Sequence, residues 1–195
     1  MTPLPRFTRR RWLALAGSAF AQPIKIASIV ELSGAGATSG TNFKNGIELA
    51  VKEINASGGI LGRKIETTTS DTQSNPGVAK GLAAKAIDDD VFAVFGPVFS
   101  GSIMVSMNES KRAEVPNFVG GEAAAITKQG NPWVFRTSFT QDTAMPKVAR
   151  YIANGLKAKT VAVLYVNNDF GKGGRDAITR SEEHTSELQS HHVIS

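Results

Sequence analysis

The chain has 195 residues, of which 41% are hydrophobic, no cysteine, and a formal net charge of +5. This length suffices for one domain, or for one domain and part of another. The lack of cysteine excludes disulfides and thiolate chemistry. Four of the positive charges, Arg6 and Arg9–Arg11, lie in the first 21 residues. Because the middle of the chain has no basic run, its charge gives no reason to expect a nucleic-acid partner.

Residues 1–21 have the features of an export signal. A basic start precedes a short apolar core, Trp12–Ala21, and Ala19–Ala21 fits an A-x-A cleavage site. The segment Thr8–Leu13 resembles a twin-arginine signal. The apolar core is too short to span a bilayer. We therefore expect an exported, periplasmic protein.

Residues 180–195 show no apolar periodicity and resemble the translation of a sequencing-adapter oligonucleotide. We expect this tail to be non-native, which would make the chain a fragment of a protein that continues past Thr179. All three histidines, His184, His191 and His192, lie in the tail. Their place in such a segment argues against a metal site, so we expect no metal ligands.

Between these ends, apolar runs alternate with segments of helical periodicity, which predicts an α/β fold with parallel, doubly wound sheets. Residues 120–140 interrupt this alternation. We expect a first lobe over residues 22–139 and the start of a second lobe over 140–179. The predicted strands are residues 24–30, 64–70, 91–95, 115–119, 133–136 and 160–166. The predicted helices are 42–56, 78–89, 100–113, 140–156 and one that starts within 171–179.

A hydroxyl-rich turn, Ser100-Gly101-Ser102, follows the strand predicted at residues 91–95 and opens the next helix. The first turn of a helix has unpaired backbone N–H groups beside a partial positive charge, which suits a carboxylate or phosphate. In an open α/β sheet this turn lies at the carboxyl edge of the strands, where ligands bind. An ordinary N-cap is the alternative interpretation.

A second candidate site is the Gly/Ser/Thr segment 32–40, predicted as a loop between a strand and a helix. Its glycines, Gly34, Gly36 and Gly40, and the later Asp71 partly fit a dinucleotide-binding loop. The distance to Asp71 is longer than the usual spacing of about 20 residues. A dinucleotide-binding oxidoreductase is therefore the alternative function.

Catalytic signatures are otherwise missing from the sequence. It has no G-x-x-x-x-G-K-[ST] or G-x-S-x-G motif, and without a histidine outside the tail it cannot form a Ser–His–Asp triad. The acidic run Asp88–Asp90 fits a solvated helix end better than a cation site. We expect no catalytic residue and no cofactor.

Five runs of residues resemble the periplasmic branched-chain amino-acid-binding proteins of ABC importers, which are type I periplasmic binding proteins. In order, they are NFKNGIELAVKEINASGGILGRKIE, DTQSNPGVA, VFGPVFSGS, VPNFVGGEAAAIT and VNNDFGKGG, spread from about Ile24 to Thr179. The resemblance implies two α/β lobes that close about a hinge over a small-molecule ligand. It also implies delivery of that ligand to a membrane permease, with no chemistry on it. A ligand-sensing receptor domain of the same fold is a further alternative.

The resemblance also implies where the ligand sits. Its carboxylate would be held by Ser100, Gly101 and Ser102, with further contacts from Glu122, Ala123 and Ala124. An aromatic side chain, here Phe170, would cover it, and the loop position near Ser39 would approach it.

This chain departs from the family at two of these positions. Family members usually have a Gly-Ala-Thr segment where this chain has Glu122–Ala124, and often an aromatic residue near Ser39. Because Glu122 adds a carboxylate, the ligand need not be a plain amino acid. The acidic residue that takes the ligand's ammonium would lie beyond this chain's end. We expect this chain alone to be poorly stable and to bind weakly, because a half-built sheet leaves unpaired strand edges and exposed apolar faces.

Overall fold

The computed structural model describes residues 22–183 and 189–194. The predicted signal, residues 1–21, and His184 lie outside the described residues. The strands are β1 Ile24–Val30, β2 Ile65–Asp71, β3 Ala93–Phe95, β4 Asn117–Val119, β5 Val134–Arg136, β6 Thr160–Tyr165 and β7 Gln189–Ile194. The helices are α2 Ala37–Ala56, α3 Pro76–Asp88, α4 Ser100–Ala113, α5 Ala125–Lys128, α6 Gln141–Arg150 and α7 Asp169–Glu183, with a 3-10 turn η1 Gly34–Gly36 and a π-helical turn η2 Tyr151–Gly155.

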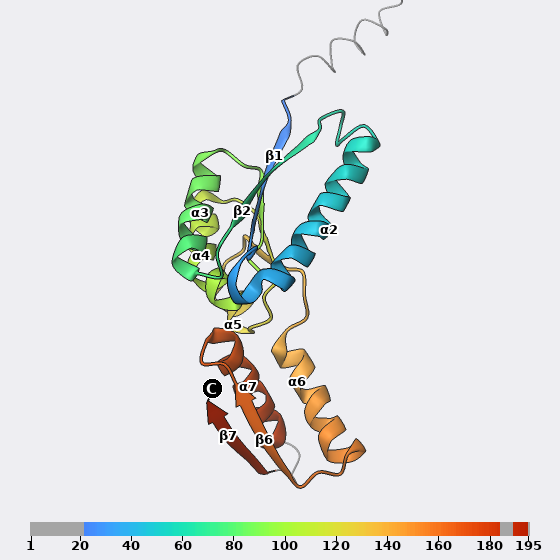
Figure 1. Ribbon diagram of the computed structural model, residues 1–195, viewed down its shortest axis with the longest axis vertical. Helices are drawn as coiled ribbons and strands as arrows, with labels where there is room; N and C mark the ends of the chain where they lie inside the picture. Colours follow the sequence, from blue (N-terminus) through green and yellow to red (C-terminus); the bar gives the residue numbers. More distant parts are fainter. Residues whose placement is uncertain (1–21, 184–188, 195) are drawn as a thin grey trace, which may run out of the picture.

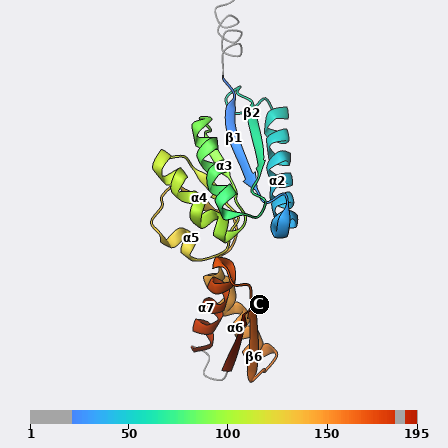
Figure 2. The same ribbon diagram turned by 60° about the vertical axis from the view of Figure 1, so that its left-hand side comes forward.

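The larger part of the molecule is built on a five-stranded sheet with the order β2-β1-β3-β4-β5, all parallel. Each strand ends at the same edge, so the turns that follow β1, β3 and β4 are neighbours there. Helix α2 covers one face of the sheet, and α3 and α4 cover the other (Figures 1 and 2). The predicted α/β class with parallel sheets is confirmed.

Alternate residues of β1 pack on opposite faces of this sheet. Ile24 and Ile26 belong to the cluster that packs against α2, whereas Ala27 and Ile29 pack with buried alanines of α3. Both faces are covered, so the strand reads as one continuous apolar run rather than an alternating one. A third cluster joins α4 to β4 and β5 through Ile103, Met107 and other apolar residues. This packing fixes α4 against the sheet beside the carboxyl edge.

A smaller part contains helices α6 and α7, which lie side by side and run in the same direction, and a second sheet, in which β7 pairs with β6 in parallel (Figure 1). Residues 180–183 continue α7, and residues 189–194 form β7. Both segments belong to the tail predicted to be non-native, and that assignment stays a prediction. Among the described residues, no helix has both the length and the apolarity needed to span a bilayer.

Most predicted elements are present, and several boundaries agree closely. The first strand and the helix from Ser100 to Ala113 have their predicted ends. The helix predicted over 78–89 begins two residues earlier, at Pro76, where Asn75 caps it with a side-chain oxygen that accepts from the amides of Gly77 and Val78. The predicted helix over 140–156 ends at Arg150 and continues as the π-helical turn η2. The last helix, predicted to start within 171–179, begins two residues earlier, at Asp169.

The prediction of a loop over residues 32–40 is also wrong. This segment forms η1 and the first turn of α2, and Gly40 is a buried helical residue rather than part of an open loop. Asp71 is engaged as well: its carboxylate accepts hydrogen bonds from the amides of Leu32, Ser33 and Gln73 and from the Ser33 hydroxyl. The glycine loop and the free carboxylate that a dinucleotide would need are therefore not available here.

Gly40 and Gly46 make a matched pair for testing the packing of α2. A Cβ atom on Gly40 would lie 1.9 Å from the Glu31 carbonyl oxygen, whereas one on Gly46 would meet nothing within 4 Å. We expect Gly40→Ala to lower the free energy of unfolding by about 3 kcal/mol or more. Gly46→Ala should raise it by about 1 kcal/mol, because alanine is the better helix former. Urea unfolding of both variants checks this, and equal effects would contradict the packing described.

Candidate functional site

Helix α4 begins at the carboxyl edge of the sheet with a turn of unsatisfied hydrogen-bond donors. Within the described part of the chain, the amides of Ser100, Gly101 and Ser102 donate to no backbone carbonyl, and the first helical bond runs from Ile103 N to Phe99 O, 3.0 Å. Ser102 is 1% exposed, and its hydroxyl oxygen is buried without a partner. This turn can therefore donate several hydrogen bonds to an anionic group.

A buried carboxylate holds the backbone that leads into this turn. Glu31 follows β1 and is fully buried, with its Oε2 accepting from Val98 N at 3.0 Å and its Oε1 from Phe99 N at 3.1 Å. These bonds satisfy the two amides just before α4 and leave those of its first turn free. The sequence analysis missed Glu31; an acidic residue directly after a buried strand, at the carboxyl edge, is the signal that would have found it.

The turn after β4 lies against the first turn of α4. Ala123 is buried, and its amide donates to Ser100 Oγ at 3.3 Å. Ala124 is half-buried and directly precedes α5. The structure thus brings together the two segments, Ser100–Ser102 and Glu122–Ala124, that the sequence analysis singled out separately.

Arg136, at the end of β5, fixes the shape of the Glu122–Ala124 turn. Its guanidinium donates to the carbonyl oxygens of Gly121 and Ala123, the residues on either side of Glu122, and to Thr127 Oγ1. Burial lowers the pKa of Arg136, while the nearby charges of Glu122 and Asp142 act in the opposite direction. The sequence analysis missed this arginine, although a cation that ends a short apolar strand is an unusual feature.

Glu122 is half-buried beside this arginine. Burial raises the pKa of the Glu122 carboxyl, and the positive charge of Arg136 only partly offsets that effect. The protonated side chain therefore persists to higher pH than in an exposed glutamate. At this position the chain can present either a carboxylate or a neutral hydrogen-bond donor, depending on pH and on what is bound.

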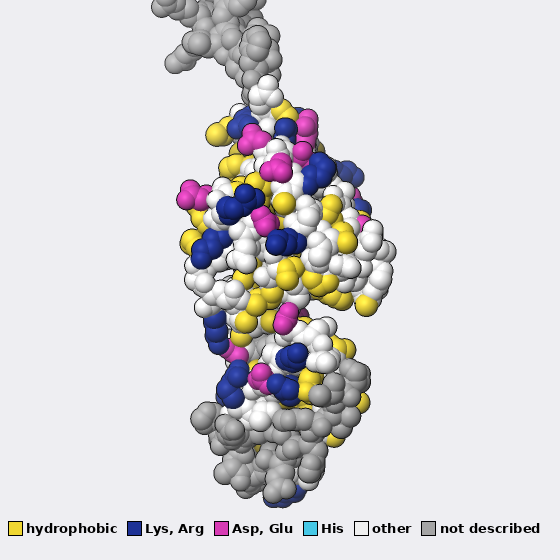
Figure 3. All heavy atoms as spheres, turned by 90° about the vertical axis from the view of Figure 1, so that its left-hand side faces the viewer, with side chains coloured by type: hydrophobic (Ala, Val, Ile, Leu, Met, Phe, Trp, Pro, Cys, Tyr) yellow, Lys and Arg dark blue, Asp and Glu magenta, His cyan; other side chains and the backbone are white. Residues whose placement is uncertain are grey.

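The start of α7 approaches the start of α4 from the smaller part of the molecule. A Cβ atom on Gly101 would lie 3.5 Å from Asp169 Oδ2, and one on Gly173 would lie 3.8 Å from Ala123 Cβ. Phe170, in the first turn of α7, is 44% exposed. A hollow of about 400 Å³ lies between α4, α5 and α7, and Figure 3 shows a notch between the two parts. The residues that line this hollow include Met104, Ala123, Ala124, Asp169, Lys172 and Gly173.

Ser39 is the one predicted site residue that the structure does not join to the others. It lies exposed in the first turn of α2, not in a loop. Farther along the same helix, Phe43 does reach the site, because a Cβ atom on Gly120 would lie 3.4 Å from its Cε2. The α2 side chain that lies next to the turn after β4 is therefore that of Phe43, one helical turn beyond the predicted Ser39.

Replacing Glu122 tests the effect of burial on its titration. Because the pKa of Glu122 is raised in the folded protein, its contribution to stability is present at low pH and is lost as pH rises through that pKa. Relative to Glu122→Gln, the wild type should therefore lose stability between about pH 4 and neutral. Denaturant unfolding at several pH values measures this. Glu53→Gln, an exposed site on α2, is the control, and a variant less stable than wild type at neutral pH would contradict the prediction.

Comparisons with known proteins show which family this chain resembles in sequence and in fold. The sequence profile of the family described as periplasmic binding protein matches residues 23–184. The Leu/Ile/Val-binding protein BraC3 of Rhizobium johnstonii is 36% identical over 166 residues, which is 85% of this chain and 45% of that protein. The chain therefore spans about half the length of the relatives it matches.

Solved structures show the same likeness. One is the branched-chain amino acid transporter substrate binding protein LivJ from Streptococcus pneumoniae in complex with isoleucine, with a TM-score of 0.76, 30% identity, and coverage of 88% of this chain and 48% of that one. Another is a periplasmic binding protein type 1 from Bordetella pertussis, with a TM-score of 0.79, 25% identity, and coverage of 87% and 49%. The resemblance found in the sequence is thereby confirmed: this chain belongs to the periplasmic binding protein family.

Proposed function

We propose that this chain carries part of an extracytoplasmic solute-binding protein that captures a branched-chain amino acid or a related small carboxylate or amide. The observation that carries the proposal is the first turn of α4, which has three free amides and the buried hydroxyl of Ser102, and which contacts the Glu122–Ala124 turn through Ser100. Fixed dipoles of this kind can share the charge of a carboxylate without a buried cation. Similar proteins that are named for binding leucine, isoleucine and valine support the choice of ligand.

In this proposal, residues 22–139 form the first lobe and residues 140–179 the start of the second. The ligand's carboxylate binds Ser100, Gly101 and Ser102, and Phe170 covers it from α7. The protein works in the periplasm and passes its ligand to the membrane permease of an ABC transporter. Such a role breaks and makes no bond in the ligand, so the chain is not an enzyme. The family match and the predicted export signal support this placement.

The dinucleotide-binding alternative receives no support from the geometry. The segment that would cradle the phosphates is helical from Ala37 onward, and Gly40 is pressed against the Glu31 backbone. Asp71 already accepts four hydrogen bonds from its own and the neighbouring loop. Hydrogen bonds of that number leave the carboxylate little capacity for a ribose hydroxyl.

Ligand binding by the gene product that contains this chain tests the proposal. We expect it to bind L-leucine, L-isoleucine or L-valine, measured by isothermal titration calorimetry. Ser100→Ala and Ser102→Ala should each weaken binding by about tenfold or more, the effect of losing one hydrogen bond to a charged group.

Ser106→Ala is the matched control for both serine variants. Ser106 is equally buried one turn further along α4, where its hydroxyl bonds to the Ile103 carbonyl rather than facing the first turn. This variant should bind with wild-type affinity. Unchanged affinity in both first-turn variants, or wild-type protein that binds none of the three amino acids, would refute the proposed function.

A further inference from the structure

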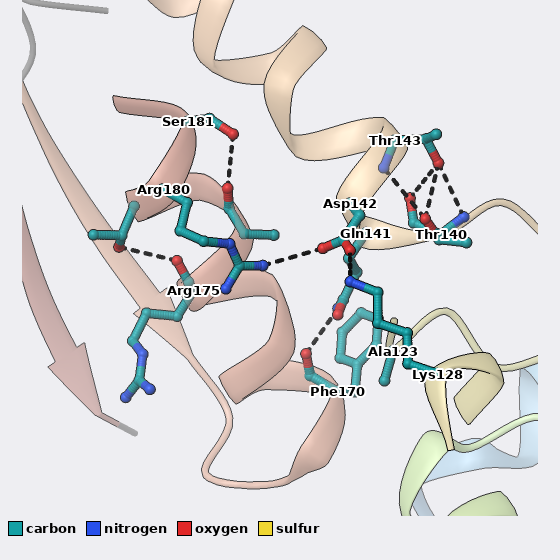
Figure 4. A network of polar contacts seen from close by, with 12 residues as sticks. Ala123, Lys128, Thr140, Gln141, Asp142, Thr143, Phe170, Arg175, Arg180 and Ser181 are labelled. Atoms are coloured by element: carbon teal, nitrogen blue, oxygen red, sulfur yellow. Dashed lines mark hydrogen bonds and ion pairs between the residues drawn. The ribbon is translucent and has the colours of Figure 1, made fainter. Parts of the chain in front are cut away.

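Gln141, the first residue of α6, links the two sides of the candidate site. Its backbone amide donates to the Glu122 carbonyl at 3.1 Å, and its side-chain Nε2 donates to the Phe170 carbonyl at 2.7 Å (Figure 4). The residue is 1% exposed. A single buried glutamine therefore contacts the turn after β4 with its backbone and the first turn of α7 with its side chain.

The packing of α7 leaves room for this side chain and for little else. A Cβ atom on Gly173 would lie 2.5 Å from Gln141 Oε1, and one on Gly174 would lie 3.2 Å from Nε2. Within the described residues Oε1 has no hydrogen-bond partner. Burying an amide with one end unpaired costs free energy, so packing alone would favour an apolar side chain of this size.

The residues on either side of Gln141 are themselves anchored. Thr140 caps α6 in a capping box with Thr143. Asp142 pairs with Lys128 of α5 and, at 3.1 Å, with Arg180 of α7. The pKa of Asp142 is lowered most by its hydrogen bond to Lys128, and the charge of Arg180 lowers it further. Because the start of α6 is held on both sides, Gln141 has little freedom to move, and a group that it binds is held in place as well.

We infer that Gln141 is a positioning residue: its side-chain amide holds Phe170 in register with the Glu122–Ala124 turn, so that the aromatic side chain is placed before the ligand arrives. The expected consequence of this arrangement is tighter ligand binding, and that consequence rests on the proposed function. Preorganising a covering side chain raises affinity because less ordering remains to be done on binding.

A double-mutant cycle on the gene product that contains this chain tests the coupling. Gln141→Met keeps the length of the side chain and removes the N–H donor, and should weaken L-leucine binding about fivefold, the worth of one ordinary hydrogen bond. Phe170→Ala should weaken it at least as much. The two losses should not add, because Gln141 acts through Phe170. Gln22→Met, at an exposed residue that precedes β1 at the opposite edge of the sheet from the site, is the control and should bind normally.

Amide hydrogen exchange without ligand separates this inference from the proposed function. In Gln141→Met, and in Gln141→Glu as a second variant without the donor, the amides of residues 171–174 should exchange faster than in Gln22→Met. Faster local exchange supports the inference even if no amino acid binds. Unchanged exchange at these amides, or losses of affinity that add fully in the cycle, would overturn it.

Discussion

The candidate site depends on one buried contact, between the Glu31 carboxylate and the amides of Val98 and Phe99. It ties the end of β1 to the backbone that enters α4. Burying an ionised group is costly unless its oxygens are hydrogen-bonded, and here each oxygen has a backbone donor. The contact also explains why glycine is needed nearby, since Cβ atoms on Gly36 and Gly40 would overlap Glu31. The chain thus uses its own carboxylate to fix the turn while leaving the next three amides for another anion.

The Glu122–Ala124 turn and the start of α7 are likewise held by polar side chains that bind backbone atoms. Arg136 binds the carbonyls on both sides of Glu122, and Gln141 binds the carbonyl of Glu122 itself and that of Phe170. These bonds run to backbone atoms, so they set the path of the chain rather than the identity of its side chains. Among the described residues, the Glu122 side chain makes no hydrogen bond and feels only the nearby charge of Arg136, which leaves its oxygens available to influence the choice of ligand.

Much of the fold was predictable because local signals agreed with the tertiary structure. The apolar run at residues 24–30 and the helix from Ser100 to Ala113 each have a clear sequence pattern and their predicted ends. The loop predicted over residues 32–40 failed for a physical reason. Its glycines favour a flexible segment in isolation, whereas in the structure Gly40 is a helical residue chosen because Glu31 leaves no room for a side chain.

By itself, the sequence determined the fold class, the family and the nomination of Ser100–Ser102 and Glu122–Ala124, because hydrophobic periodicity and short motifs are local properties. Only the tertiary structure decided that these two turns touch through Ser100 and Ala123, that Ser39 stands apart, and that Glu31, Arg136 and Gln141 support the site. Those three side chains act on backbone atoms distant in sequence or on a neighbouring element. No local pattern encodes such contacts, since they exist only once the strands and helices have packed.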